Sequence, residues 1–513
     1  MIDRTSILDG PGNINPYIEL LSELSVSNQN EAWQRRFLET AGRRLLQLDR
    51  GATRALILGF RPLRDALDLG ATQFLAPVLD AVLESQVAHG DVPFEAPNSL
   101  LERRDDPALA LRVAQLVMGH ARRRRTEIFQ RPAWAWFGDR KLRVGYVCSD
   151  LNMHPVGLSV RSLMLRHDRD RFDITVYDRT TEPKQPVQGP VKLAADQFRA
   201  VPGLSVPDLR KMILSDGIDI LVDLSGAPLD PLRDVFCLGA APLQVSMLGY
   251  PGGIGQETVD YYVADPVTVP PSERSGFSEC LILMPGSFLP VDDQMPDEDP
   301  PPRSALGLPE DAFVMAAFNR LNKLDLSTIR LWFTCLRRIP NTVLWCAVDE
   351  GPGRSNLLKL LSDAGLDPDR VVVTDRVGIR EHRARISAAD IALDPIGYNG
   401  GYTTALAIQR GVPVVTLPGH SFAWRMSAGI LSAAGLPEGI AESPADYFAR
   451  VERFASDPLW LASCRNRLLE KTSSLFFNPG AYIRALEEAF MRIANNRRNG
   501  LKDEDVVVSA RSG

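Results

Sequence analysis

The chain has 513 residues, 45% hydrophobic and 24% charged, with 64 acidic and 58 basic side chains and a formal net charge of −6. This length predicts two or three domains, and the composition is that of an ordinary globular protein. The acidic balance argues against a nucleic-acid binder, and no apolar run approaches the ~20 residues that a membrane-spanning helix needs.

The six cysteines are scattered and form no CxxC pair. We therefore expect reduced thiols, a cytoplasmic location and no structural zinc site. The first residues, Met1–Thr5, lack the basic start and apolar core of a signal peptide.

Residues 1–135 are predicted to form a helical domain that binds an acceptor or partner. Apolar positions recur at helical spacing in Phe37–Leu48, Phe74–Val87 and Leu109–Val117. Degenerate helical repeats remain open, although no fixed period is found. The arginines at 122–125 are typical of a solvated helix end, with partner binding as the alternative. The aromatic residues Trp134, Trp136 and Phe137 are expected to dock this domain onto the rest.

From residue 142 onward, short apolar runs alternate with amphipathic stretches. The first strand candidates are Leu142–Val147, Phe172–Tyr177, Ile218–Val222, Gln244–Leu248, Tyr261–Val263 and Cys280–Leu283. After a linker at Pro290–Pro302, the second series is Phe313–Ala317, Val343–Cys346, Val371–Thr374, Ile391–Leu393 and Val412–Leu417. This alternation predicts an α/β fold with parallel sheets. We expect two lobes, 141–300 and 303–495, facing a cleft, with a helix at Pro479–Asn495 and a flexible tail over 496–513.

Polar residues follow two of these strands. The cluster Phe318–Lys323 comes directly after one strand and offers cationic donors at the carboxyl edge of the sheet, where ligands bind in open α/β folds. After the strand that ends at Asp394, two glycines and two threonines in Asn399–Thr404 open a predicted helix, so that free N–H groups face an anion. Together they predict a site for a phosphate-bearing ligand, most simply a nucleotide sugar.

The motifs also carry a family resemblance. In chain order they are LRVGYVCSD at 142–150, His154-Pro155, DGIDILVDLSG at 216–226, LGYPG at 248–252, DYYVAD at 260–265, Phe318–Lys323, Glu381-His382, Asn399–Thr404, and Leu417-Pro418-Gly419 with Arg425. As an ordered set they resemble the catalytic region of the protein O-linked N-acetylglucosamine transferases and their bacterial relatives. The resemblance implies two Rossmann-like domains of the GT-B type. It also implies inverting transfer of a sugar to Ser or Thr of a protein, without metal or other cofactor. Flagellin, or another bacterial surface protein, is the acceptor expected by analogy.

The resemblance also implies roles for single residues. Lys323 is expected to contact the donor diphosphate and to stabilise the leaving group. His154 is expected beside the acceptor, where it could relay a proton, although Asp150 or Asp223 could serve as the base instead. His382 is expected near the nucleotide base. The alternatives are a surface lysine for Lys323, a structural histidine for His154 and an exposed residue at a helix start for His382. His420 is not assigned to the site.

Donor binding is assigned to two sets of residues. The first set is Asn319, Arg320, His382, Gly400, Gly401, Tyr402, Thr403 and Thr404, and the second, lining the cleft, is Gly249, Tyr250, Pro251 and Gly252. For the second set a simple tight turn is the alternative, and a threonine at the helix start is also an ordinary N-cap.

Some positions depart from the family pattern and leave the donor open. The family commonly has an acidic residue at Leu406 and histidine at Gly286, Gly401 or Ala227. Arg320 stands where the animal enzymes have glutamine, and it suits a phosphate or a donor carboxylate. The donor is therefore UDP-N-acetylglucosamine-like or a CMP-linked nonulosonic acid. The alternatives in function are a nucleotide-binding scaffold that has lost turnover, and transfer to a small-molecule or lipid-linked acceptor.

Overall fold

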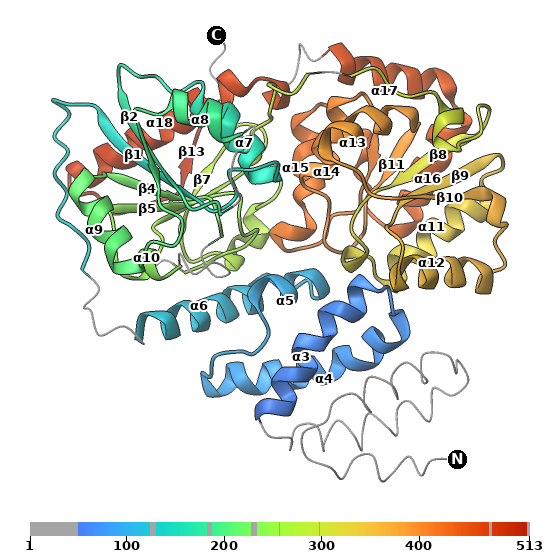
Figure 1. Ribbon diagram of the computed structural model, residues 1–513, viewed down its shortest axis with the longest axis horizontal. Helices are drawn as coiled ribbons and strands as arrows, with labels where there is room; N and C mark the ends of the chain where they lie inside the picture. Colours follow the sequence, from blue (N-terminus) through green and yellow to red (C-terminus); the bar gives the residue numbers. More distant parts are fainter. Residues whose placement is uncertain are drawn as a thin grey trace.

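The computed structural model describes residues 50–123, 130–181, 187–226, 233–255, 257–296, 298–470 and 475–509. The predicted helix Phe37–Leu48, the arginines at 124 and 125, and Ala227 lie outside these ranges. The described chain forms a small helical domain that lies across two α/β lobes (Figure 1).

The helical domain consists of four described helices: α3 (Arg50–Asp65), α4 (Leu69–His89), α5 (Pro97–Arg103) and α6 (Pro107–Arg123). The two predicted helical stretches that the structure describes fall inside α4 and α6. The domain contacts both lobes. On the first lobe, Arg122 pairs with Glu257 at 3.2 Å; on the second, the indole Nε1 of Trp424 donates to the carbonyl of Leu101 at 2.7 Å. It therefore connects the two lobes at the end where both sheets have their carboxyl edges.

The first lobe is built on an eight-stranded parallel sheet in the order β13-β7-β6-β5-β4-β1-β2-β3. Its strands are β1 (Leu142–Cys148), β2 (Phe172–Asp178), β3 (Gln197–Ala200), β4 (Ile220–Asp223), β5 (Leu243–Ser246), β6 (Tyr261–Ala264), β7 (Cys280–Leu283) and β13 (Val506–Val507). Its helices are α7 (Pro155–Met164), α8 (Gln188–Ala194), α9 (Val206–Asp216), α10 (Arg233–Cys237) and α18 (Pro479–Arg498). The six predicted strands are present. The sequence did not reveal β3 and β13, because both are short and only two of the four residues of β3 are apolar.

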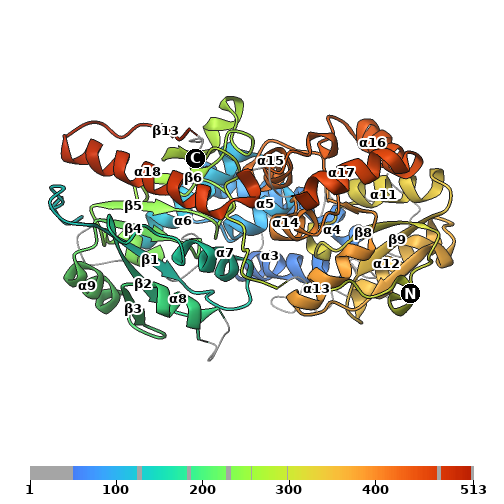
Figure 2. The same cartoon turned by 90° about the horizontal axis from the view of Figure 1, so that it is seen from above.

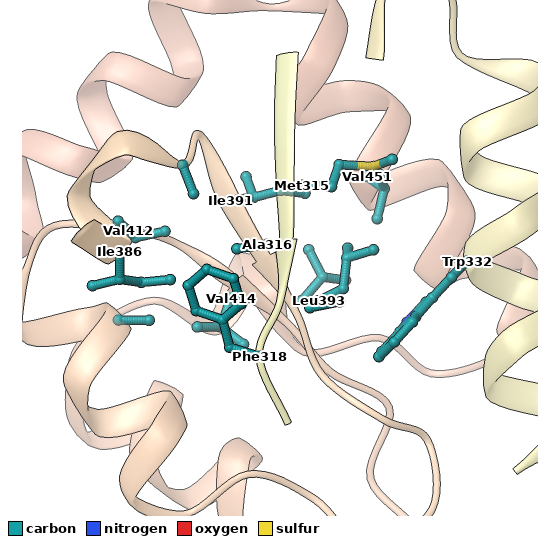
Figure 3. Close-up of a cluster of buried hydrophobic side chains, with 14 of the residues drawn as sticks. Met315, Ala316, Phe318, Trp332, Ile386, Ile391, Leu393, Val412, Val414 and Val451 are labelled. Atoms are coloured by element: carbon teal, nitrogen blue, oxygen red, sulfur yellow. The ribbon is translucent and has the colours of Figure 1, made fainter. Parts of the chain in front are cut away.

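The second lobe has a five-stranded parallel sheet in the order β10-β9-β8-β11-β12. Its strands are β8 (Phe313–Ala317), β9 (Thr342–Ala347), β10 (Val371–Thr374), β11 (Ile391–Leu393) and β12 (Val414–Val415). Its helices are α11 (Leu326–Arg338), α12 (Pro352–Asp363), α13 (Ile379–Arg385), α14 (Tyr402–Gln409), α15 (Met426–Ala433), α16 (Pro444–Ser456) and α17 (Pro458–Glu470). Side chains of the sheet and its helices, including Met315, Leu393, Trp332 and Val451, form one buried core (Figure 3).

The strand order gives each sheet one switch point. In the first sheet the order reverses between β1 and β4, and in the second between β8 and β11. Ligands of open α/β sheets bind at such switch points, outside the carboxyl ends of the strands. The predicted fold class, two Rossmann-like lobes behind a helical domain, is thereby confirmed.

The end of the chain returns to the first lobe, which differs from the prediction. Helix α18 runs along that lobe (Figure 2), and its Leu486 and Phe490 share a buried core with β1 and β2. Val506 pairs with Ile282 of β7, and Val508 is buried. The second lobe therefore ends before α18, and no flexible tail begins at residue 496. The amphipathic face of α18 and the two inward valines cover apolar surface that the first sheet would otherwise expose.

The aromatic segment after the helical domain docks only in part. Trp136 is buried in the core of the first lobe, under the guanidinium of Arg498 at 5.5 Å from its ring centroid. Phe137, in contrast, is 68% exposed and does not dock. All six cysteines are buried with free thiols. Within the described ranges, no helix is both long and apolar enough to cross a membrane.

Candidate active site

Lys323 lies where the two crevice loops of the second lobe meet. It ends a 3₁₀ turn, Leu321–Lys323, directly after β8. Its Nζ donates to the carbonyl of Asn399 at 2.8 Å and lies 4.4 Å from the ring centroid of Tyr398. Burial lowers the pKa of Lys323 to about 8, against the opposing effects of Asp394 and Glu102. The ammonium is thus held beside the turn that opens α14.

Asp394 organises that turn. Its Oδ1 accepts from the backbone N–H of Gly400 at 2.7 Å, and its Oδ2 accepts from the hydroxyl of Thr416 at 2.8 Å. The amide of Asn319 lies 3.5 Å from the same Oδ1. Burial raises the pKa of Asp394 to about 6. The site prediction did not include Asp394, although an acidic residue directly after a buried strand was the available signal.

The glycine at 400 is required by this packing. A Cβ there would lie 2.4 Å from the hydroxyl oxygen of Thr404 and 2.8 Å from Oδ1 of Asp394. At Gly401 a Cβ would meet nothing closer than the sulfur of Met426 at 3.6 Å. The turn therefore tolerates no side chain at 400 and has room for one at 401.

Helix α14 begins with unpaired backbone donors. Its first bond across the cap is donated by Ala405 to the carbonyl of Gly401 at 3.0 Å. Within the described residues, the N–H groups of Gly401, Tyr402 and Thr403 donate to no acceptor, as the first turn of a helix leaves them. The hydroxyl of Thr404 is bonded to Ser427 at 2.7 Å, whereas Thr403 is half-buried. Free N–H groups of this kind, with the Lys323 ammonium beside the same turn, are able to receive an anion, and we call them the candidate anion site.

His382 lies next to the end of β8. Its ring packs against Phe318 with centroids 5.3 Å apart, and the guanidinium of Arg385 lies 4.9 Å from the same phenyl centroid. Burial, assisted by Arg385, lowers the pKa of His382 to about 4. The imidazole is therefore neutral at pH 7 and half-buried, as suits a ring that contacts a nucleotide base.

His154 contributes from the first lobe as the N-cap of α7. Its Nδ1 accepts from the backbone N–H of Val156 at 3.3 Å. In the neutral ring the hydrogen then sits on Nε2. His154 is exposed, and its partial desolvation lowers its pKa; Asp150 opposes this shift and Arg320 reinforces it. Arg320 belongs to the loop after β8 in the other lobe.

The burial of three further residues bears on two questions: which carboxylate could act as the general base, and which cation could contact the nucleotide-sugar donor. Asp223 is buried and engaged by the N–H of Ser225 at 3.0 Å, so it is inaccessible. Asp150 is half-buried, close to His154. Arg320 is exposed and makes no ion pair within the described residues. Within the described ranges, no group of three or more His, Cys, Asp or Glu side chains is arranged to hold a metal ion.

The loop at 249–252 and Tyr402 take part in packing, and the buried ring of Tyr250 does not line a cleft as predicted. Tyr250 is fully buried in a core shared with the helical domain, and Pro251 and Gly252 are buried as well. Gly249 packs so closely on the loop after β4 that a Cβ would lie 2.2 Å from the backbone N of Gly226. The side chain of Tyr402 packs against the core of the first lobe. The glycines here thus serve contact between two loops, and the tyrosines serve packing.

The departures from the family pattern lie partly outside the site. Leu406 is 3% exposed, so it offers no side chain to a ribose. Gly286 lines a separate cavity of about 930 Å³ along α18, which shares no residue with the site. His420 pairs with Glu273 at 3.1 Å.

The chain was compared with protein-family models, with known protein sequences and with solved structures. The chain matches the model of glycosyl transferase family 41 over residues 90–296 and 301–486. It is 28% identical to the probable UDP-N-acetylglucosamine–peptide N-acetylglucosaminyltransferase SEC of Arabidopsis thaliana, over 84% of this chain and 46% of that protein. It is 24% identical to the corresponding enzyme of Caenorhabditis elegans, over 72% of this chain and 42% of that protein. The chain thus spans less than half the length of these relatives.

A solved structure, an O-GlcNAc transferase mutant of Thermobaculum terrenum, superposes with a TM-score of 0.71. The alignment covers 98% of this chain and 100% of that one at 24% identity, which shows a common fold. The family model covers most of both lobes and extends into the helical domain. The chain therefore belongs to glycosyl transferase family 41.

Proposed function

We propose that the chain is an inverting, metal-independent protein O-glycosyltransferase that moves a sugar from a nucleotide-sugar donor to Ser or Thr of a protein. The observation that carries the proposal is the placement of the Lys323 ammonium beside the open start of α14. The names of the plant and nematode relatives support a peptide acceptor and a UDP-N-acetylglucosamine-like donor.

The donor phosphates would occupy the anion site of the second lobe. The N–H groups at 401–403 and the Lys323 ammonium are fixed before the reaction begins, so they stabilise negative charge as the sugar–phosphate bond breaks. The neutral ring of His382, beside Phe318, would contact the base.

The acceptor hydroxyl would enter from the side of the first lobe. With Nδ1 engaged by Val156, His154 presents Nε2–H and acts as a hydrogen-bond donor, so the proton of the acceptor must go to another group. Asp150 carries the nearest carboxylate that is not fully buried, and we assign it that role. In this account His154 orients the reactants, and Asp150→Asn lowers the rate more than His154→Gln does.

Arg320 bears on the identity of the sugar. An exposed guanidinium with no ion pair in the described residues is available to an anionic group. It fits either a donor phosphate or the carboxylate of a CMP-linked nonulosonic acid, with flagellin or another surface protein as acceptor.

The test is the replacement Lys323→Ala, with the exposed Lys359→Ala of the same lobe as matched control. Transfer from a panel of UDP-, CMP-, GDP- and dTDP-sugars to a Ser/Thr-containing acceptor protein is measured by intact-mass spectrometry. We expect Lys323→Ala to lose more than about 100-fold in rate, from loss of a charge-assisted contact in the transition state, while its melting temperature and the control stay unchanged. Wild-type rates from Lys323→Ala would reject the mechanism. A nucleotide that raises the melting temperature, without product from any donor, would favour the scaffold alternative.

A further inference from the structure

The loop that carries Lys323 rests on the helical domain. A cavity of about 180 Å³ lies between α3, α4, α5 and the second lobe, and Arg64, Glu102, Lys323 and Trp424 are among its lining residues. The guanidinium of the buried Arg64 donates to the backbone carbonyl of Asn322, the residue before the lysine. The helical domain thus forms one wall of the place where the ammonium is held.

Glu102, near the end of α5, is the acidic residue of that wall. It is 6% exposed, and its Oε1 accepts from the amide of Asn98 at 3.3 Å and lies 3.9 Å from Arg61. Its Oε2 has no hydrogen-bond partner within the described residues. A buried carboxylate oxygen without a hydrogen-bond partner destabilises the folded state. A buried carboxylate of this kind, on a wall shared with Lys323, points to a role beyond the stability of α5.

We propose that Glu102 is a positioning residue through which the helical domain stabilises the ammonium of Lys323 at the anion site. The proposal rests on the function proposed above for Lys323. It makes the helical domain part of the catalytic machinery, in addition to any role in binding an acceptor.

The charges around the two residues define the expected effect. Lys323 is faced by Asp394 from the end of β11, by Glu102 from α5 and by Arg320 from its own loop. Both carboxylates raise the pKa of Lys323 and so oppose the lowering of that pKa by burial. Glu102 is faced in turn by Arg61 and Arg64 of α3, and burial raises its pKa. Removing the charge of Glu102 leaves Asp394 as the sole acidic neighbour among these groups.

The decisive variant is Glu102→Gln, with Glu102→Asp as the conservative replacement. Glu95→Gln is the matched control, because Glu95 is 2% exposed in the same domain, pairs with Arg103 at 2.7 Å and is not among the charged groups that act on Lys323. Acylation of Lys323 by acetic anhydride is followed against pH by peptide mass spectrometry, since only the neutral amine reacts. Transfer rates and melting temperatures are measured on the same full-length proteins.

In Glu102→Gln we expect the acylation midpoint of Lys323 to move to lower pH, and transfer at pH 8.5 to fall about threefold to tenfold, since one pKa unit is a tenfold change in the charged fraction. In Glu102→Asp, the acylation midpoint and the transfer rate should lie between those of Glu102→Gln and the wild type. Glu95→Gln should lower the melting temperature but leave the acylation midpoint and the transfer rate unchanged. An unchanged midpoint in Glu102→Gln, or an equal change in Glu95→Gln, overturns the proposal. If the wild type transfers no sugar, the proposed glycosyltransferase function is rejected. The acylation midpoints still decide whether Glu102 stabilises the charged form of Lys323. Should Glu102→Gln not fold, the midpoint of Glu102→Asp decides the question.

Discussion

Replacing Gly400 with alanine tests the geometry of the anion site directly. The added Cβ would lie 2.4 Å from the hydroxyl oxygen of Thr404, which is 1.0 Å inside the 3.4 Å at which ordinary contact begins. Neither crowded neighbour can turn away freely, because Thr404 is bonded to Ser427 and Asp394 is bonded to Thr416. The turn itself must therefore move.

The size of the effect follows from that displacement. Overpacking of a well-packed site costs about 1–3 kcal/mol, and the shift also misaligns the N–H groups that receive the phosphates. If the whole cost appears in nucleotide binding, the dissociation constant rises about fivefold to 150-fold. The residue next to it provides the control, since a Cβ at Gly401 makes only ordinary contacts.

Isothermal titration calorimetry with UDP and CMP, together with thermal unfolding, measures both consequences. We expect Gly400→Ala to lose affinity and some stability, and Gly401→Ala to keep both within about twofold, as an uncrowded substitution does. Wild-type nucleotide affinity in Gly400→Ala, or equal damage from Gly401→Ala, would show that the turn at 400–404 does not hold the phosphates.

Three further predictions concern charge and the end of the chain. Because burial lowers the pKa of Lys323 to about 8, its positive charge is present below that pH and is lost as pH rises through it. Transfer should therefore decline above pH 8 in a rate–pH profile, and a flat profile up to pH 10 contradicts the assignment. Arg320→Gln should weaken calorimetric binding of a donor with a sugar carboxylate by about tenfold to 100-fold, the size of a lost hydrogen bond to a charged group. Equal losses for neutral sugars would place Arg320 on the phosphates instead. Ending the chain at residue 499 removes the buried Val506 and Val508 and should cost about 3 kcal/mol or more in urea unfolding; a merely flexible tail would cost nothing.

The strands that carry the fold were predictable because their signal is local. Phe313–Ala317, Val371–Thr374 and Ile391–Leu393 are apolar runs bounded by polar or turn residues, and the structure gives them the predicted limits. The two-residue β13 has no such signal. Its place depends on pairing with β7, more than 200 residues earlier in the chain, which only the assembled sheet reveals.

The site residues also fall into those with a local sequence signal and those placed only by long-range contacts. The Lys323 loop and the α14 turn were predictable because residues after neighbouring parallel strands meet at one sheet edge. Glu102 was not, because its approach to Lys323 depends on how the helical domain docks. Tyr250 illustrates the opposite error: a glycine-rich turn after a strand favours a ligand loop, yet the ring fills a core that the helical domain completes.

The return of the chain to its first sheet also constrains the order of synthesis and assembly. The second lobe lies within the stretch that ends before α18, so its residues leave the ribosome while the outer edge of β7 still lacks β13. An uncovered strand edge is a site for pairing with other chains. The nascent protein should therefore hold a complete second lobe beside a first lobe that still lacks α18 and β13, and its need for chaperones should last until β13 has emerged.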